Sequence, residues 1–426
     1  MMNFKDKYFL WLRTSSPWFT YLAFTSFFVY GKFYYRYLTN ALPLHWELWF
    51  NDTIVSLFFA LSAYFLHRLW VASKKNADSD LGKNVHNSRI FIFDEDLEKK
   101  LNYFLFSLIA ILILIGFLSV GNPFSNPLGF RQAIQGGGAA YFFLTFLFFF
   151  KFKGITYFNK VYLKKSNFTD HASMLVIIAF CFTTGFASLF VYFFMAGLLF
   201  LNIRYSVRII RASTIIVFVA LLVFTPLYTI IREQLMFGTA DIPQIYKLFV
   251  ENIMDDPLKI IYNRYDYFDN QVLGSYFSRI YMDIWKIFDT LLQPVPRLFY
   301  AEKPPIFSTY LTNLTYPNLK TIGVSINFGY LSEFVLYLGD FGPVIGGMFF
   351  GWILSVSYGY FSKGTKDGNA AVIYILAIYT YFSGFIVGYL NEAPIQMLII
   401  AYILLRMLGW KTWGREVANT PEVKIG

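Results

Sequence analysis

Long apolar runs are the feature that most constrains this chain. Runs of roughly 16 to 33 residues recur along the sequence, and about 20 apolar residues in a helix are enough to cross a bilayer. A membrane β-barrel would instead alternate apolar and polar residues in segments of about ten. Only 15% of the residues are charged, against about a quarter in soluble domains. The sequence therefore predicts an all-α, polytopic membrane protein.

The flanking charge of the longest run sets the expected number of spans. The run 172–203 is too long for one helix, and lysines precede it while arginines follow it. Because positive residues gather in cytoplasmic loops, both flanks are expected in the cytoplasm, with two short helices that turn near Thr183 to Gly185. We expect about ten transmembrane helices in all, with both termini cytoplasmic. The other expected spans are 17–38, 48–73, 102–120, 134–150, 212–231, 336–361, 370–390 and 395–410.

Three regions follow from this topology. Residues 1–231 hold transmembrane helices 1–7, residues 232–335 form one large extracytoplasmic loop, and residues 336–426 hold helices 8–10 and a cytoplasmic tail. The net charge of +10 comes largely from short loops between apolar runs, so it indicates topology rather than nucleic-acid binding. The single cysteine and the four scattered histidines have no ligand spacing. No metal and no cofactor are therefore expected.

The large loop carries most of the candidate anion-binding residues, in the stretches NRYDYFDN (263–270) and QPVPRLFYAEKPP (293–305) and between them. Guanidinium and ammonium groups bind pyrophosphate well, although the same cations could instead pair with loop carboxylates and fold the loop. Arg131 is a further candidate, because it is a lone charge in the outer loop GNPFSNPLGFRQAIQGGG (121–138). The candidates are Arg131, Arg264, Arg279, Arg297 and Lys303, and the competing loop carboxylates are Asp266, Asp269, Asp283 and Glu302.

Candidate carboxylates lie where the chain re-enters the membrane, in GVSINFGYLSEFVLYLGDFGPVIGGMFFGWIL (323–354). Helical spacing would place Glu333, Tyr337 and Asp340 on one face that enters from outside. These carboxylates could act as a general base or pair with loop arginines, and the two interpretations are compatible. The glycines that follow have small-xxx-small spacing, which predicts a helix-packing face. Residues at the outer end of the second span could join the site: His45, Glu47 and Asp52.

The chain resembles the O-antigen polymerases (Wzy-type) of bacterial surface polysaccharides. The resemblance depends on PVPRLFYAEKPP ahead of GYLSEFVLYLGDFG at the mouth of a late span, on about ten spans, and on one large outer loop. It implies a GT-C-like glycosyltransferase in the bacterial plasma (inner) membrane, with its active site facing outward. Such an enzyme transfers the growing O-antigen or capsule chain from undecaprenyl pyrophosphate to the non-reducing end of a newly flipped lipid-linked repeat unit.

The resemblance also implies roles. Arginines would stabilise the pyrophosphate leaving group without a metal, and Glu333, or Asp340 or Asp266 after it, would accept the proton of the acceptor hydroxyl. The expected partners are undecaprenyl-pyrophosphate-linked oligosaccharide and membrane lipid, with room for a chain-length regulator protein. Family members are usually discussed through arginines in two outer loops, and this chain departs from that pattern because TTGFAS (183–188) carries none.

Two other functions remain open at this stage. The O-antigen ligase shares the lipid donor but depends on a loop histidine, and no histidine lies between Arg232 and Val335. A transporter or flippase of lipid-linked oligosaccharide should show about twelve spans, two similar halves and ionisable residues at mid-membrane. Here the halves differ, and the charge lies at the outer mouth. These features favour the polymerase.

Overall fold

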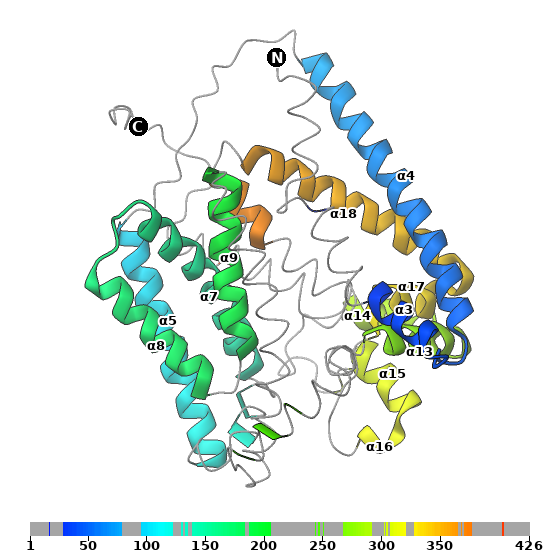
Figure 1. Ribbon diagram of the computed structural model, residues 1–426, viewed down its shortest axis with the longest axis horizontal. Coiled ribbons are helices and arrows are strands. Elements are labelled where there is room, and N and C mark those ends of the chain that lie inside the picture. Colours follow the sequence, from blue (N-terminus) through cyan, green and yellow to red (C-terminus); the bar gives the residue numbers. More distant parts are fainter. Residues whose placement is uncertain are drawn as a thin grey trace.

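The computed structural model describes those parts of the chain that Figure 1 draws in colour. The described residues are 29–78, 95–121, 139–183, 187–205, 267–291, 307–320, 328–364 and 370–376, with a few isolated positions between them. All regular secondary structure in these ranges is helical, which confirms the all-α prediction for this part of the chain.

Three stretches of this part are long and apolar enough to cross a membrane, which indicates a membrane protein. They are Trp46–Ser73, Glu98–Val120 and Gly329–Gly364, and they fall in α4 (Trp46–Asp78), in α5 (Glu95–Val120), and in α17 (Gly329–Leu338) with α18 (Gly342–Gly364). Two expected spans, 212–231 and 395–410, lie outside the described residues apart from position 403. The expectation of ten spans therefore stays a prediction.

A second group of helices packs beside α5 (Figure 1). It consists of α7 (Ala139–Tyr162), α8 (Phe168–Thr183) and α9 (Ala187–Tyr205), and its core is rich in phenylalanine. The break between α8 and α9 falls where the sequence predicted a turn, so the apolar run 172–203 does divide between two short helices.

Helices α4 and α18 form a close parallel pair. A methyl group added at Gly347 would collide with the backbone of Ser56, and one added at Gly351 would collide with that of Ala60. Only a residue without a side chain allows this approach, so the glycine face predicted from the spacing is confirmed. The contacts advance in the same order along both helices. The pair is therefore parallel, as expected if both helices enter the membrane from the same side.

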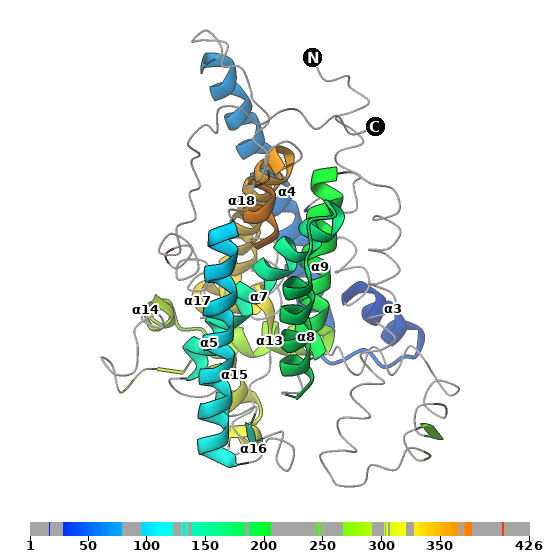
Figure 2. The same cartoon turned by 90° about the vertical axis from the view of Figure 1, so that its left-hand side faces the viewer.

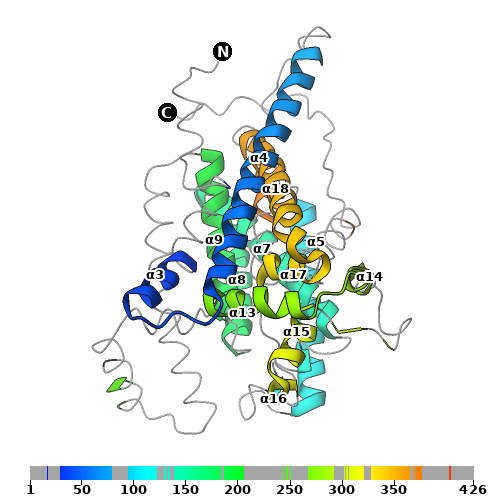
Figure 3. The ribbon, with the colours of Figure 1, turned by 90° about the vertical axis from the view of Figure 1, so that its right-hand side faces the viewer.

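Short helices gather around the ends at which α4 and α17 begin (Figure 3). They are α3 (Gly31–Leu38), α13 (Tyr267–Ile280), α14 (Lys286–Leu291), α15 (Phe307–Thr315), α16 (Pro317–Lys320) and the 3-10 turn η2 (Gly339–Phe341). Helix α13 comes from the segment predicted to be the large loop, and its apolar side packs Phe268 and Val272 into the same core as Trp49 of α4 and Leu331 of α17. This part of the loop therefore packs directly on the apolar helices.

Candidate functional site

Arg279 links three elements at the ends where α4 and α18 begin. From the last turn of α13, its Nη2 donates to Asp52 Oδ1 of α4 over 2.6 Å and its Nη1 donates to Asp52 Oδ2 over 2.8 Å. Its Nε donates to Asp340 Oδ1 of η2 over 3.0 Å, and Nη1 also donates to the carbonyl of Ser275 over 3.3 Å. These contacts use all but one of the five N–H donors of a guanidinium. We call Asp52, Ser275, Arg279 and Asp340 the entrance cluster.

The two carboxylates of the entrance cluster differ in exposure. The side chain of Asp52 is 6% exposed, while that of Asp340 is 88% exposed. A bidentate pair shielded from water is among the stronger ionic contacts, whereas an exposed pair contributes little. The hydrogen bonds that Arg279 donates to Asp52 are also the largest reason why the pKa of Arg279 is raised above its ordinary value. Asp52 therefore fixes the guanidinium, and Asp340 is its solvent-exposed partner.

Glu333 and Asp340 do not share one helical face, so that part of the prediction was wrong. Glu333 is fully buried on α17 and accepts a hydrogen bond from the Tyr337 hydroxyl over 3.3 Å, one turn away as expected. The helix then ends at Leu338, because Gly339 adopts a φ of +56° and lies against the sulfur of Met282. This break turns Asp340 out of the helix and into solvent.

The other end of α13 is held by a second set of charges. Asp269 Oδ2 lies 3.0 Å from Lys32 Nζ and 2.6 Å from Arg36 Nη2, both on α3. Nearby, Trp49 Nε1 donates to Gln271 Oε1 over 3.3 Å. Asp269 was expected to pair with cations of the loop, and its pairing with α3 was not predicted. Lys32 and Arg36, four residues apart at the end of an apolar run, could have indicated a shared partner. Ion pairs therefore tie one end of α13 to α3 and the other end to α4.

Two of the three residues considered at the start of the second span contact α13. Asp52 binds Arg279, and the ring of His45 stacks on that of Tyr276 with centroids 3.8 Å apart and planes 3° apart. His45 adopts a φ of +66°, which is uncommon for a residue with a side chain. The third, Glu47, is exposed. The histidine therefore contacts α13 at Tyr276, three residues before Arg279.

Several candidates fall outside the described part of the chain, so the structure does not place them. Among the described residues, no group of three or more His, Cys, Asp or Glu side chains could hold a metal ion. The candidates that the structure does not place are Asp266, Arg131, Arg264, Arg297 and Lys303.

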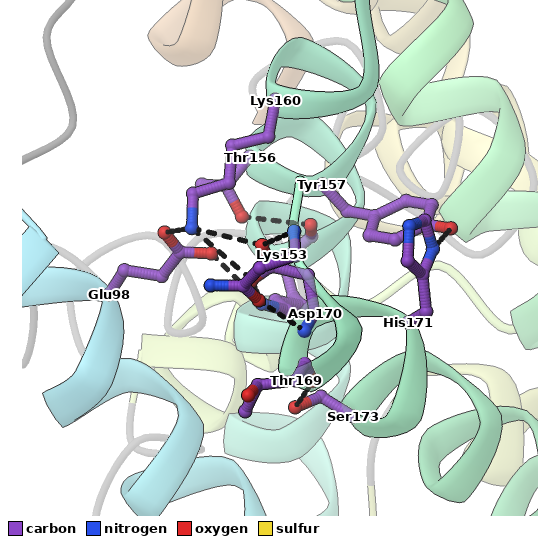
Figure 4. A network of polar contacts seen from close by, with 10 residues as sticks. Glu98, Lys153, Thr156, Tyr157, Lys160, Thr169, Asp170, His171 and Ser173 are labelled. Carbon is purple, nitrogen blue, oxygen red and sulfur yellow. Dashed lines mark hydrogen bonds and ion pairs between the residues drawn. The ribbon is translucent and has the colours of Figure 1, made fainter. Parts of the chain in front are cut away.

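A buried ionic cluster lies where α5 begins, α7 approaches its end and α8 begins (Figure 4). Lys153 Nζ of α7 lies 3.1 Å from Glu98 Oε1 of α5 and 4.0 Å from Asp170 Oδ1 of α8. Lys160 Nζ of α7 lies 3.2 Å from Asp170 Oδ1 and also contacts Glu98 Oε2. We call these four residues the buried tetrad. None of these four residues was among the candidates predicted from the sequence.

The surroundings favour the charged forms of Asp170 and Lys160, whereas burial lowers the pKa of Lys153 against the opposing effect of Glu98 and Asp170. Burial alone would raise the pKa of Asp170, but the Asn167 backbone N–H and Lys160 outweigh it and hold the pKa below its ordinary value. For Lys160 the pKa is raised, because the hydrogen bonds and charges of Glu98 and Asp170 outweigh the opposing effect of burial. Two cations therefore balance two anions with little exposure, which suits a structural lock between α5, α7 and α8 rather than an anion-binding site.

Comparisons with known proteins found no relative in which either cluster could be examined. The sequence matches no family model, and neither a curated protein nor a solved structure matches it. The assignment of function therefore depends on the chemistry of these side chains.

Proposed function

We propose that this protein is a GT-C-like membrane glycosyltransferase that polymerises lipid-pyrophosphate-linked repeat units of a bacterial surface polysaccharide. In this proposal the chain has about ten spans and both termini in the cytoplasm, and the entrance cluster faces outward across the plasma membrane. One observation carries the proposal: Arg279 is fixed by the buried Asp52, keeps 21% of its own side chain exposed, and has a second carboxylate partner, Asp340, that lies in solvent. A cation positioned in this way at a membrane boundary suits the phosphate groups of a lipid donor.

The donor would bind by replacing Asp340 on Arg279. A pyrophosphate oxygen can accept the Nε–H that Asp340 accepts here, as well as the one remaining Nη2–H. Charge develops on the pyrophosphate as it leaves, and a cation already fixed in place stabilises that charge without reorganising. Other basic residues would complete the pyrophosphate site: Arg131, Arg264, Arg297 and Lys303.

The acceptor step needs a carboxylate within reach of a sugar hydroxyl. The hydroxyl oxygen forms a bond to the anomeric carbon, the bond from that carbon to pyrophosphate breaks, and the hydroxyl proton passes to the carboxylate. Asp340 is exposed and would be released from Arg279 by the donor, so accessibility ranks it ahead of the buried Glu333. Glu333 would serve as the base only if α17 moved, and Asp266 is the third candidate.

The direct test is to supply the purified protein, in lipid nanodiscs, with a lipid-pyrophosphate-linked repeat unit and to separate the products by length. The proposal predicts a ladder of products for the wild type and a much weaker ladder for Asp340→Asn. The control is Glu47→Gln, which changes an exposed carboxylate on the same helix as Asp52. Failure to form a ladder from several matched repeat units would contradict the polymerase proposal.

One observation favours the O-antigen ligase as a second candidate. The ligase alternative was disfavoured because the loop has no histidine, yet His45 stacks on Tyr276 of the loop helix α13. A ligase would transfer the glycan to a lipid A core rather than to a second repeat unit. Offering both acceptors to the same preparation therefore separates the two functions, and loss of core transfer in His45→Ala would support the ligase.

A further inference from the structure

The segment that follows Arg279 exposes large apolar side chains. Five of its residues are 53 to 71% exposed, although the segment belongs to a loop predicted to lie outside the membrane: Ile280, Met282, Ile284, Trp285 and Phe288. Its charged side chains instead contact other protein groups: Lys286 Nζ lies 2.7 Å from Asp289 Oδ2 and 4.8 Å from the centre of the Tyr310 ring. The segment therefore has the reverse of the pattern expected for a water-facing loop.

This exposure is built into the fold, because the segment is held on both sides of its apolar residues. The backbone N–H of Asp283 donates to the carbonyl of Leu336 on α17 over 2.8 Å. The carboxylate of Asp283 in turn accepts the backbone N–H of Trp285 over 2.9 Å, which starts the turn into α14. The rings of Trp285 and Phe288 then stack with centroids 5.6 Å apart. The two aromatic side chains are thus presented together on a fixed turn.

The apolar surface continues onto a helix that is long enough to cross the membrane. Phe341, in the turn before α18, is 74% exposed, and Ile345, Met348 and Trp352 follow it at helical spacing on the exposed side of α18. Figure 2 and Figure 3 show α14 projecting sideways from the bundle, on the side opposite α3, near the end at which α18 begins. The exposed apolar side chains of α18 therefore begin close to the loop segment, whose Met282 lies against Gly339 just before Phe341.

We propose that residues 280–288, together with Phe341, form an anchor that lies in the interfacial zone of the outer leaflet. The partner is the lipid bilayer itself: the aromatic rings enter the boundary between headgroups and acyl chains, and the Lys286–Asp289 pair stays on the protein side. Tryptophan is enriched at this depth in membrane proteins, and short amphipathic segments bind there through their apolar face. The anchor follows Arg279 directly, so it holds the guanidinium at the level of lipid phosphates. It requires only a bilayer and stands whether or not the protein is a polymerase.

Site-directed fluorescence quenching tests this anchor. In a Cys181→Ser background, single cysteines at Trp285 and at Phe288 are labelled with an environment-sensitive fluorophore, and the protein is placed in phosphatidylethanolamine–phosphatidylglycerol nanodiscs. Asn318→Cys, on the exposed helix α16 farther from α18, is the matched aqueous control, and Met348→Cys is the lipid-facing control. Lipids with a spin label near the headgroup should quench the 285 and 288 probes several-fold more than the 318 probe.

A change in the fold would be detected separately. Each variant is compared with the parent by thermal unfolding, and the Ile284→Cys probe repeats the measurement with both aromatic residues intact. Quenching of the 284, 285 and 288 probes no stronger than that of the 318 probe would overturn the proposal. Stronger quenching at all three positions, by headgroup labels more than by mid-chain labels, is the expected result.

Discussion

The entrance cluster and the buried tetrad use the same kinds of side chain in different surroundings. In the tetrad, two lysines and two carboxylates balance one another, and three of the four side chains are at most 5% exposed. In the entrance cluster, one arginine has two carboxylate partners, and one of these is almost fully in solvent. The first arrangement is complete and suits structural stability. The second has one partner in solvent, and in the proposed function this is the partner that the pyrophosphate replaces.

The largest effect should come from breaking the tetrad. Lys153→Met leaves two buried carboxylates with one cation, which should reduce the free energy of unfolding by about 3 to 5 kcal/mol. Thermal unfolding in detergent measures this. The double variant Glu98→Leu/Lys153→Met removes both charges of one pair and should recover much of the loss, because desolvation offsets most of the attraction in buried pairs. A double variant as unstable as the single one would show that the tetrad is not a balanced lock.

A smaller loss is expected at the entrance cluster. Asp52→Asn keeps the shape but removes the charge that binds Arg279 bidentately, which should cost about 2 kcal/mol of stability. The freed guanidinium should also reduce the rate of product formation, because Arg279 loses its fixed position. The unfolding temperature and the rate at which the product ladder forms are measured on the same preparation. A normal ladder rate in a destabilised Asp52→Asn protein would mean that Asp52 has only a structural role.

The pH dependence of stability should show the tetrad as well. Because the pKa of Asp170 is lowered, its contribution is fully present above the ordinary aspartate pKa of about 3.9 and is lost as the pH falls through the folded-state value. The stability difference between wild type and Asp170→Asn should therefore be constant near neutral pH and shrink in acid. The control is the stability difference between wild type and Glu47→Gln, because Glu47 is an exposed carboxylate. If the stability difference between wild type and Asp170→Asn grew larger in acid, the lowered pKa of Asp170 would be contradicted.

The smallest effect on stability should come from Asp340→Asn. The pair with Arg279 is exposed, so its loss should change the free energy of unfolding by about 0.5 kcal/mol or less. The same change should strengthen the binding of inorganic pyrophosphate, because the competing carboxylate charge is gone. Calorimetric titration measures the affinity. Weaker pyrophosphate binding in this variant would contradict the view that an anion replaces Asp340.

Two features of the described helices were predicted correctly from the sequence. The break after Thr183 followed from run length and flanking charge, and the glycine face of α18 followed from its spacing. Both are local properties, read directly from neighbouring residues. The end of α17 was missed because the backbone conformation of Gly339 depends on the packing of Met282, which is distant in sequence.

The pairing of charges was harder to predict. Arg279 and Asp340 were both candidates, and their mutual contact was one of the interpretations considered. The partners chosen across long separations were not predictable: Asp52 lies 227 residues from Arg279, and Asp269 pairs with α3 rather than with loop cations. Which carboxylate reaches which cation depends on how helices pack, and one sequence carries no information on those distances.

The most direct test of the central claim makes the same substitution in the two ion pairs that hold the ends of α13. One arginine, Arg279, lies on α13 itself, and the other, Arg36, lies on α3. Arg279→Lys and Arg36→Lys each keep a positive charge and each replace a guanidinium paired with an aspartate. Product formation from a lipid-pyrophosphate-linked repeat unit is then measured for both. If Arg279 binds the pyrophosphate, Arg279→Lys should slow the ladder about 100-fold, because a lysine cannot reproduce the planar guanidinium contacts, while Arg36→Lys stays near the wild-type rate. Equal rates for the two variants would contradict the claim that the entrance cluster is the site of the chemistry.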